Sequence, residues 1–323
     1  MLHPITMNQV LPLIGIVAPC FNEQEVLLDS LAKLQTLLLD YKKNNVIHQD
    51  SFILLVDDGS KDNTWELIEN AATNNLHIKG LKLAKNAGHQ KALLSGLLAF
   101  KNKADALISI DVDLQDDIHV IEQMIHAFNA GSQIVYGIRK DRSTDSFFKR
   151  KSAHLYYKFL HIMNVNVYYN HADFRLSSSK VINELDKYGE VNLFLRGIYP
   201  LIGFNHSMVF YDRLERTAGE SKYPLRKMLS FAWEGITSFS IKPLRMVTTI
   251  GFLIFFGSLL MSLYALYSYF MGNALQGWVS TVLPMYFLGG VQLLCVGIIG
   301  EYIGKIYLEV KKRPRYVIEK IIE

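Results

Sequence analysis

The sequence predicts an α/β domain with a mostly parallel sheet, followed by two membrane-spanning helices. Over the first 220 residues, short apolar runs alternate with longer segments of helical periodicity, an order typical of parallel sheets covered by helices. Residues 246–300 contain no Asp, Glu, Lys or Arg, whereas one span needs about 20 apolar residues. Half of the 323 residues are hydrophobic and 20% are charged, which excludes a mainly disordered chain.

The elements of the predicted domain follow one another at short intervals. Strands are expected over 13–18, 51–56, 78–83, 106–110 and 132–137. Helices are expected between them, over 25–41, 63–73, 90–100 and 118–130. Ligands of such sheets bind beyond the carboxyl ends of the strands, and there the sequence has its acidic and glycine residues. We therefore expect the functional site at that edge.

The uncharged C-terminal stretch predicts two spans, over 246–270 and 278–299, joined by a short turn. Lys and Arg flank both outer ends and are absent from the turn, so the positive-inside rule places both termini in the cytoplasm. Two buried helices of a soluble protein are the alternative reading. Residues 224–245 carry apolar side chains at helical spacing, as an interfacial amphipathic helix or an ordinary domain helix would.

Four segments are expected from this division: a domain over 1–223, a juxtamembrane segment over 224–245, a hairpin over 246–308 and a basic tail over 309–323. The net charge is only +4, too weak for a protein that coats nucleic acid. The two cysteines, Cys20 and Cys295, are far apart in the sequence and support neither a disulfide framework nor a cysteine-based zinc site.

Acidic residues follow the second and the fourth predicted strands. Residues 57–60 read Asp-Asp-Gly-Ser and residues 111–116 read Asp-Val-Asp-Leu-Gln-Asp. Two carboxylates spaced in this way suit Mg²⁺ or Mn²⁺, which prefer oxygen ligands and commonly bind substrate phosphates as well. Either segment alone is equally explained by a turn or a helix cap.

The combination is more specific, because six segments together resemble the GT-A glycosyltransferases of family 2. Within that family the resemblance is to the polyisoprenyl-phosphate sugar transferases, which include bactoprenol glucosyltransferases and dolichol-phosphate mannose synthases. The segments are 18–23, 56–60, 86–92, 111–116, 172–176 and 216–223, in family order. Lys85, Asp117 and Ala172 stand where Arg, Pro and Gly are common in the family, which leaves the choice of donor open.

The resemblance implies a site for a UDP-sugar and a divalent cation. Asp57 would accept the imide N–H of uracil, and the turn over 85–91 would offer N–H groups to phosphate oxygens. Asp113 would be the main ligand of Mg²⁺ or Mn²⁺, with Gln115 beside it. The implied nucleotide-binding residues are Pro19, Phe21, Asn22, Glu23, Asp57, Asp58, Gly59, Ser60, Asn86, Gly88, Lys91 and Asp111.

The resemblance also makes Asp173 the candidate catalytic carboxylate, accompanied by Asp113, Asp116 and Arg175. A phosphate monoester has a second pKa near 6, so the acceptor is already mostly dianionic and a strong base is hardly required. A role for Asp173 as a base and a role in positioning both stay open. The acceptor phosphate would meet a cationic group of residues. These are Arg139, Arg150, Arg216 and Lys222.

The expected reaction is an inverting, in-line transfer of a hexose or N-acetylhexosamine from a UDP-sugar to undecaprenyl phosphate. The product would serve the modification of a surface glycan such as O-antigen, at the inner membrane. A lipid-sugar flippase and a homo-oligomer are the implied protein partners, and no nucleic acid is expected. A processive polysaccharide synthase is one alternative, although none of Trp65, Trp233 and Trp278 completes its Gln-x-x-Arg-Trp block. A catalytically silent scaffold is the other.

Overall fold

The computed structural model describes residues 11–140, 171–212, 236–237, 240–271 and 278–323. These residues form two compact units. Of the described residues, the first unit takes in 11–140, 171–212 and the C-terminal segment Pro314–Glu323. The second takes in 236–237, 240–271 and 278–313. The chain therefore leaves the first unit and returns to it at its end.

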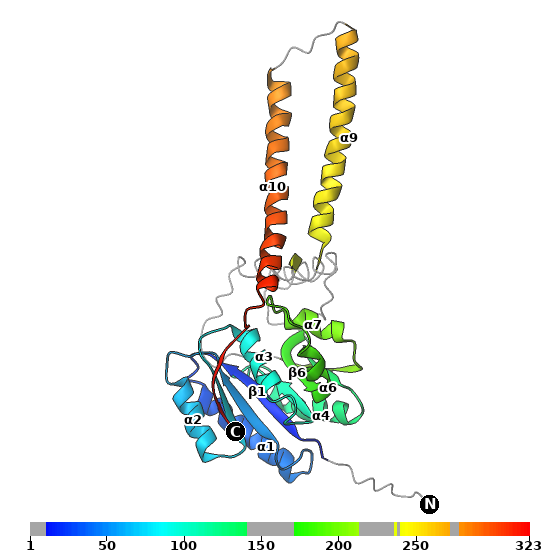
Figure 1. The fold of residues 1–323 in the computed structure, drawn as a ribbon. Coiled ribbons are helices and arrows are strands. Elements are labelled where there is room, and N and C mark those ends of the chain that lie inside the picture. Colours follow the sequence, from blue (N-terminus) through cyan, green and yellow to red (C-terminus); the bar gives the residue numbers. More distant parts are fainter. Residues whose placement is uncertain (1–10, 141–170, 213–235, 238–239, 272–277) are drawn as a thin grey trace, which may run out of the picture. The chain divides into compact units, whose positions relative to one another are not determined.

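A mixed sheet of eight strands forms the centre of the first unit (Figure 1). The strand order is β7-β5-β6-β4-β1-β2-β3-β8. Strands β4, β1, β2 and β3 run parallel to one another, β6 is antiparallel to both β4 and β5, and β7 is parallel to β5. The strands are β1 (Ile14–Cys20), β2 (Phe52–Asp57), β3 (Ile78–Leu83), β4 (Ala106–Ser109), β5 (Ile134–Arg139), β6 (His171–Ser178), β7 (His206–Tyr211) and β8 (Ile318–Ile322). The five strands expected from the sequence are confirmed, and β6, β7 and β8 are additional.

Helices cover both faces of this sheet. The helices α1 (Leu27–Lys43), α2 (Thr64–Asn74) and α4 (Ile121–Asn129) contribute to one continuous core with β1, β2, β4 and β6. On the other face, α3 (His89–Ala99) lies so close to β1 and β2 that a Cβ atom at Gly96 would be 2.7 Å from Val56. A short helix, η1 (Ile118–Val120), precedes α4, and α6 (Ser179–Leu185) and α7 (Leu195–Ile202) follow β6. The four predicted helices are confirmed to within a few residues.

Strand β6 is one of the three strands that the apolar pattern did not reveal. All eight of its residues are buried. Ala172, Phe174 and Leu176 belong to the hydrophobic core, and Asp173 and Arg175 alternate with them, so their side chains project to the opposite face. A strand placed between two neighbours thus carries its polar residues inside the fold, where they need partners.

The C-terminal residues, expected as a basic tail, include a strand. β8 pairs antiparallel with β3 at the edge of the sheet, where it is the red strand beside the C-terminus in Figure 1. Ion pairs accompany the ladder, such as that between Lys82 and Glu319 at 3.0 Å. The strand itself carries one lysine, Lys320, which lies 2.5 Å from Glu69, whereas the remaining Lys and Arg of the tail precede the strand in the sequence.

In the second unit, two long helices occupy the uncharged stretch. They are α9 (Lys242–Phe270) and α10 (Trp278–Lys311). Among the residues that the structure describes, one helical segment is long and apolar enough to cross a membrane, Phe287–Lys311, with a mean hydropathy of 1.6. The prediction of two spans is therefore met in part: both helices form where expected, and one qualifies as a span. Most of the amphipathic segment over 224–245 lies outside the described residues.

Candidate active site

Two loops at the carboxyl ends of β1 and β2 are bonded to each other. The N–H of Asn22 donates to Ser60 Oγ at 2.9 Å, and Asn22 Oδ1 accepts from the N–H of Lys61 at 2.9 Å. Asn22 itself has a φ of 54°, a left-handed conformation that asparagine tolerates better than most residues. Asn22 and Ser60 thus shape the loops by contacts with each other, while the neighbouring Phe21 side chain is 41% exposed.

The two aspartates that end β2 are both buried. Asp57 accepts from the N–H of Ser60 at 3.2 Å, and Asp58 accepts from the N–H groups of Ala87 at 2.7 Å and Gly88 at 2.9 Å. Burial raises the pKa of both carboxyls, and these hydrogen bonds act against that rise. Asp58 therefore fixes the loop that leads into α3. The N–H groups of Ala87 and Gly88 are already paired with Asp58, and the expected contact of the turn over 85–91 with a phosphate stays a prediction for its other N–H groups.

A glycine permits this approach of two loops. Gly59 has a φ of +68°, and a Cβ atom there would lie 2.6 Å from the backbone nitrogen of Asn86. The loop over 84–88 can consequently lie directly against the end of β2, which brings His89, the first residue of α3, to the edge of the sheet. Lys91 lies in the first turn of the same helix, and Pro19 is buried within β1.

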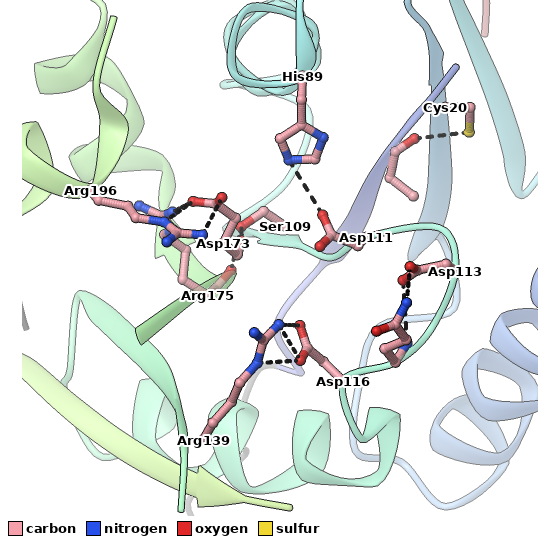
Figure 2. A network of polar contacts seen from close by, with 12 residues as sticks. Cys20, His89, Ser109, Asp111, Asp113, Asp116, Arg139, Asp173, Arg175 and Arg196 are labelled. Atoms are coloured by element: carbon pink, nitrogen blue, oxygen red, sulfur yellow. Dashed lines mark hydrogen bonds and ion pairs between the residues drawn. The ribbon is translucent and has the colours of Figure 1, made fainter. Parts of the chain in front are cut away.

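The loop after β4 places three carboxylates at that edge, each with a different partner (Figure 2). Asp111 lies 3.3 Å from His89 Nε2. Asp113 accepts a hydrogen bond from the side-chain amide of Gln115. Asp116, which is 2% exposed, is held by Arg139, whose Nη2 atom lies 2.9 Å from Oδ1. Arg139, expected to bind the acceptor phosphate, is thus already paired with a carboxylate.

The charge around Asp111 and Asp113 is only partly compensated. Burial raises the pKa of Asp111 to about 6, with a further contribution from three neighbouring carboxylates and an opposing one from His89. The described residues contain no group of three or more His, Cys, Asp or Glu side chains arranged to hold a metal by themselves. Asp111 and Asp113, which have no arginine partner in the part of the chain that the structure describes, nevertheless fit a divalent cation that takes its remaining ligands from phosphates and water.

Strand β6 and helix α7 supply a second charged group next to the first (Figure 2). Asp173 is bonded to Arg175 and also to Arg196, whose Nη2 donates to Oδ2 at 3.0 Å. Burial alone would raise the pKa of Asp173, but Arg196 and then Arg175 outweigh it and hold the pKa well below its ordinary value. A carboxylate held in this way is a weak base, because its protonated form is strongly disfavoured.

The guanidinium of Arg175 is buried and stacked. It is 1% exposed and lies 4.3 Å from the centre of the Tyr199 ring, and no described residue accepts a hydrogen bond from its Nε or Nη1 atoms. Tyr199 in turn accepts from Ser177 Oγ at 3.0 Å. Asp173, Arg175 and Tyr199 therefore form one packed unit in which the carboxylate has little freedom to move.

The structure brings together most of the residues that the sequence singled out, and it adds two. His89 and Arg196 were not among the predicted site residues. Arg196 is the one charged residue of α7, and a single arginine in an apolar helix is a signal that sequence reasoning could have used. Of the predicted phosphate-binding residues, Arg150, Arg216 and Lys222 lie outside the described residues.

Comparison with known proteins identifies relatives over most of the chain. Residues 15–199 match the model of glycosyl transferase family 2, and residues 242–306 match that of the GtrB C-terminal hairpin. The uncharacterized glycosyltransferase YkoT of Bacillus subtilis is 50% identical over 97% of this chain and 93% of its own. The SfII prophage-derived bactoprenol glucosyl transferase of Shigella flexneri is 41% identical over 95% and 97%. A solved mannosyltransferase from Pyrobaculum calidifontis, in complex with GDP-Man and Mn²⁺, has a TM-score of 0.47 and 11% identity, covering 72% of this chain and 64% of that one.

Proposed function

This chain belongs to glycosyl transferase family 2, and from that premise we propose that it transfers a hexose or N-acetylhexosamine from a UDP-sugar to a polyprenyl phosphate. One observation carries the proposal: the incompletely neutralised pair Asp111 and Asp113 lies next to Asp173 and its two arginines. A nucleoside diphosphate and a sugar-accepting phosphate require such neighbouring groups. The bactoprenol glucosyl transferase that is 41% identical supports the lipid acceptor.

The donor is proposed to bind at the ends of β1 and β2. The exposed ring of Phe21 can stack on the base, and Asp57 can accept its imide N–H. Asp113 with Asp111 would hold Mg²⁺ or Mn²⁺, which neutralises the charge of a diphosphate leaving group when bound. Gln115 would keep the Asp113 carboxylate oriented, since its amide already donates to that carboxylate.

The acceptor phosphate attacks as the nucleophile, because its second pKa near 6 leaves it mostly dianionic at neutral pH. Asp173 positions the reacting groups: its low pKa makes it a poor proton acceptor, whereas its bonds to Arg175 and Arg196 fix its orientation. Attack on the anomeric carbon with departure of UDP gives inversion. The contribution of these residues is positioning and charge stabilisation.

The lipid acceptor requires a membrane location. We assign residues 1–223 and the returning C-terminal strand to the catalytic domain, 224–245 to an interfacial segment and 246–308 to a two-span hairpin with both termini in the cytoplasm. The apolar segment Phe287–Lys311 and the match of residues 242–306 to a C-terminal hairpin support this assignment.

The test is turnover of a panel of UDP-sugars by the purified full chain, with undecaprenyl phosphate and Mg²⁺ or Mn²⁺. Mass spectrometry of the lipid identifies the sugar. We expect one donor to give a lipid-phosphate-sugar, Asp113→Ala to abolish the product, and Asp117→Asn to retain it, because Asp117 only caps η1. A lipid-independent polymer would support a synthase instead, and UDP binding without any turnover would support a scaffold.

A further inference from the structure

A cavity of about 380 Å³ lies at the amino ends of β2 and β3, whereas the candidate active site lies at the carboxyl ends of the strands. It is lined by the C-terminal half of α1, the residues after α2 and the first residues of β2 and β3. Both strands run from this cavity to the active edge, since Ile53 lines the cavity and Asp57 ends the same strand. Nothing in the proposed transfer reaction uses this cavity.

Lys42 is the unusual residue of the cavity. It is 4% exposed, although it lies in the last turn of a surface helix, and no described residue accepts a hydrogen bond from its Nζ atom. Its backbone carbonyl accepts from the side-chain amide of Gln49 at 3.1 Å and from the N–H of Asn45 at 3.2 Å. A buried ammonium group without a partner is costly, and burial accordingly lowers the pKa of Lys42.

A second group that can carry positive charge lines the same cavity. Burial lowers the pKa of His77, and the charges of Lys42 and Lys79 lower it further, against the opposing effect of Asp50. Among the described residues, no carboxylate forms an ion pair with Lys42, and the Asp50 carboxylate lies instead 3.5 Å from His48 Nδ1. Two basic groups therefore share a cavity in which the charge of Asp50 compensates them only in part, without an ion pair to Lys42 among the described residues.

The remaining walls define the shape of a fitting ligand. Leu38, Ile53 and Ile78 provide an apolar surface, and Gln35 and Asn75 provide hydrogen-bonding groups. We propose that this cavity binds a small organic anion, with its carboxylate or phosphate group between Lys42 and His77 and a short apolar part against Leu38 and Ile53. An anion there supplies the charge that the protein lacks, and its binding stabilises the folded domain.

The first test is thermal unfolding of the full chain with hexanoate or with inorganic phosphate, against sodium chloride at equal ionic strength. Saturating UDP and Mg²⁺ are present throughout, and they keep phosphate from the candidate active site. The variant Lys42→Met keeps the length of the side chain and removes the charge, and Lys43→Met is the matched control on an exposed neighbour. We expect a rise in Tm for the wild type and Lys43→Met, and none for Lys42→Met. A response to hexanoate but not to phosphate identifies a carboxylate with an apolar part as the ligand class, and the reverse identifies a phosphate.

The second test is made on the wild type and does not depend on the Lys42→Met variant. The NMR signal of His77, assigned by its loss in His77→Gln, reports the local charge. We expect its pKa to rise when hexanoate or phosphate binds the wild type. An equal Tm response of the wild type and Lys42→Met, or a His77 pKa that neither anion moves, would overturn the proposal. Neither readout involves sugar transfer, and the comparison of Lys42→Met with Lys43→Met locates the response in this cavity whether or not UDP binds.

Discussion

Of the two site residues that were not predicted from the sequence, Arg196 is the one whose substitution we expect to affect kcat/KM more. Its two bonds to Asp173 keep that buried carboxylate ionised. Arg196→Gln should lower kcat/KM about 10- to 100-fold, since a hydrogen bond to a charged group contributes roughly 1.5–3 kcal/mol. The pKa of Asp173 then rises, because burial is no longer outweighed to the same extent, and its ionised form is lost as the pH falls.

The measurement is the ratio of variant to wild-type kcat/KM between pH 5 and pH 8. Taking the ratio removes the titration of the acceptor phosphate, which both proteins share. For Arg196→Gln the ratio should fall toward low pH, whereas for Arg196→Lys, which keeps a cation beside Asp173, it should stay flat. A flat ratio for both variants would mean that Arg196 does not control the ionisation of Asp173.

At the scale of the elements, the contact between the loop after β2 and the loop before α3 depends on Gly59. Gly59→Ala and Gly88→Ala both place a side chain at a positive φ that L residues rarely adopt, a strain of about 1–3 kcal/mol at each position. Only at Gly59 would the new Cβ atom also collide with backbone, 2.6 Å from Asn86, because nothing lies within 4 Å at Gly88. Gly59→Ala should therefore lower the Tm and the affinity for UDP more than Gly88→Ala does. Calorimetry with both variants measures the difference. Equal losses of Tm and of UDP affinity would show that the two loops can move apart at Gly59 without a further cost.

The strands and helices differ in how well the sequence predicts them. The strands and helices up to residue 139 were predictable, because each has one clear apolar pattern. β6 was missed since one of its faces is polar, where Asp173 forms an ion pair with Arg175. The period-2 alternation of residues 171–176 was a usable signal for it.

The candidate site was predictable by residue type but not by partner. Asp58, Asp113 and Asp116 were all expected at the active edge, and they lie there. Which of them holds a loop and which pairs with an arginine depends on contacts between residues that are distant in sequence, such as Asp58 with Ala87 and Asp116 with Arg139. Spacing along the chain contains no information on these pairs.

For the whole molecule, the return of the chain to the sheet after α10 is the feature with the widest consequence. The segment over 223–313 is connected to the first unit at both of its ends, and β8 secures the second connection by its ladder with β3. Without β8, β3 becomes an open edge whose unpaired N–H and C=O groups favour association with other chains. On the assignment proposed above, this second connection limits the freedom of the catalytic domain relative to the hairpin.

Deletion of residues 318–323 should therefore lower the Tm of the domain and promote aggregation. The deletion should also reduce transfer to membrane-embedded undecaprenyl phosphate more than transfer to a short, water-soluble polyprenyl phosphate. With β8 gone, only the connection near residue 223 holds the domain to the hairpin, and the effective concentration of the embedded lipid at the site is lower. Lys320→Gln is the matched control: it removes the ion pair with Glu69 but keeps the ladder, and an exposed ion pair contributes at most about 1 kcal/mol. Turnover with both acceptors, measured beside a melting curve for each variant, separates the two effects. If the deletion reduced both transfers equally, β8 would act on stability alone, and if it melted like the wild type, the ladder with β3 would contribute nothing to the fold.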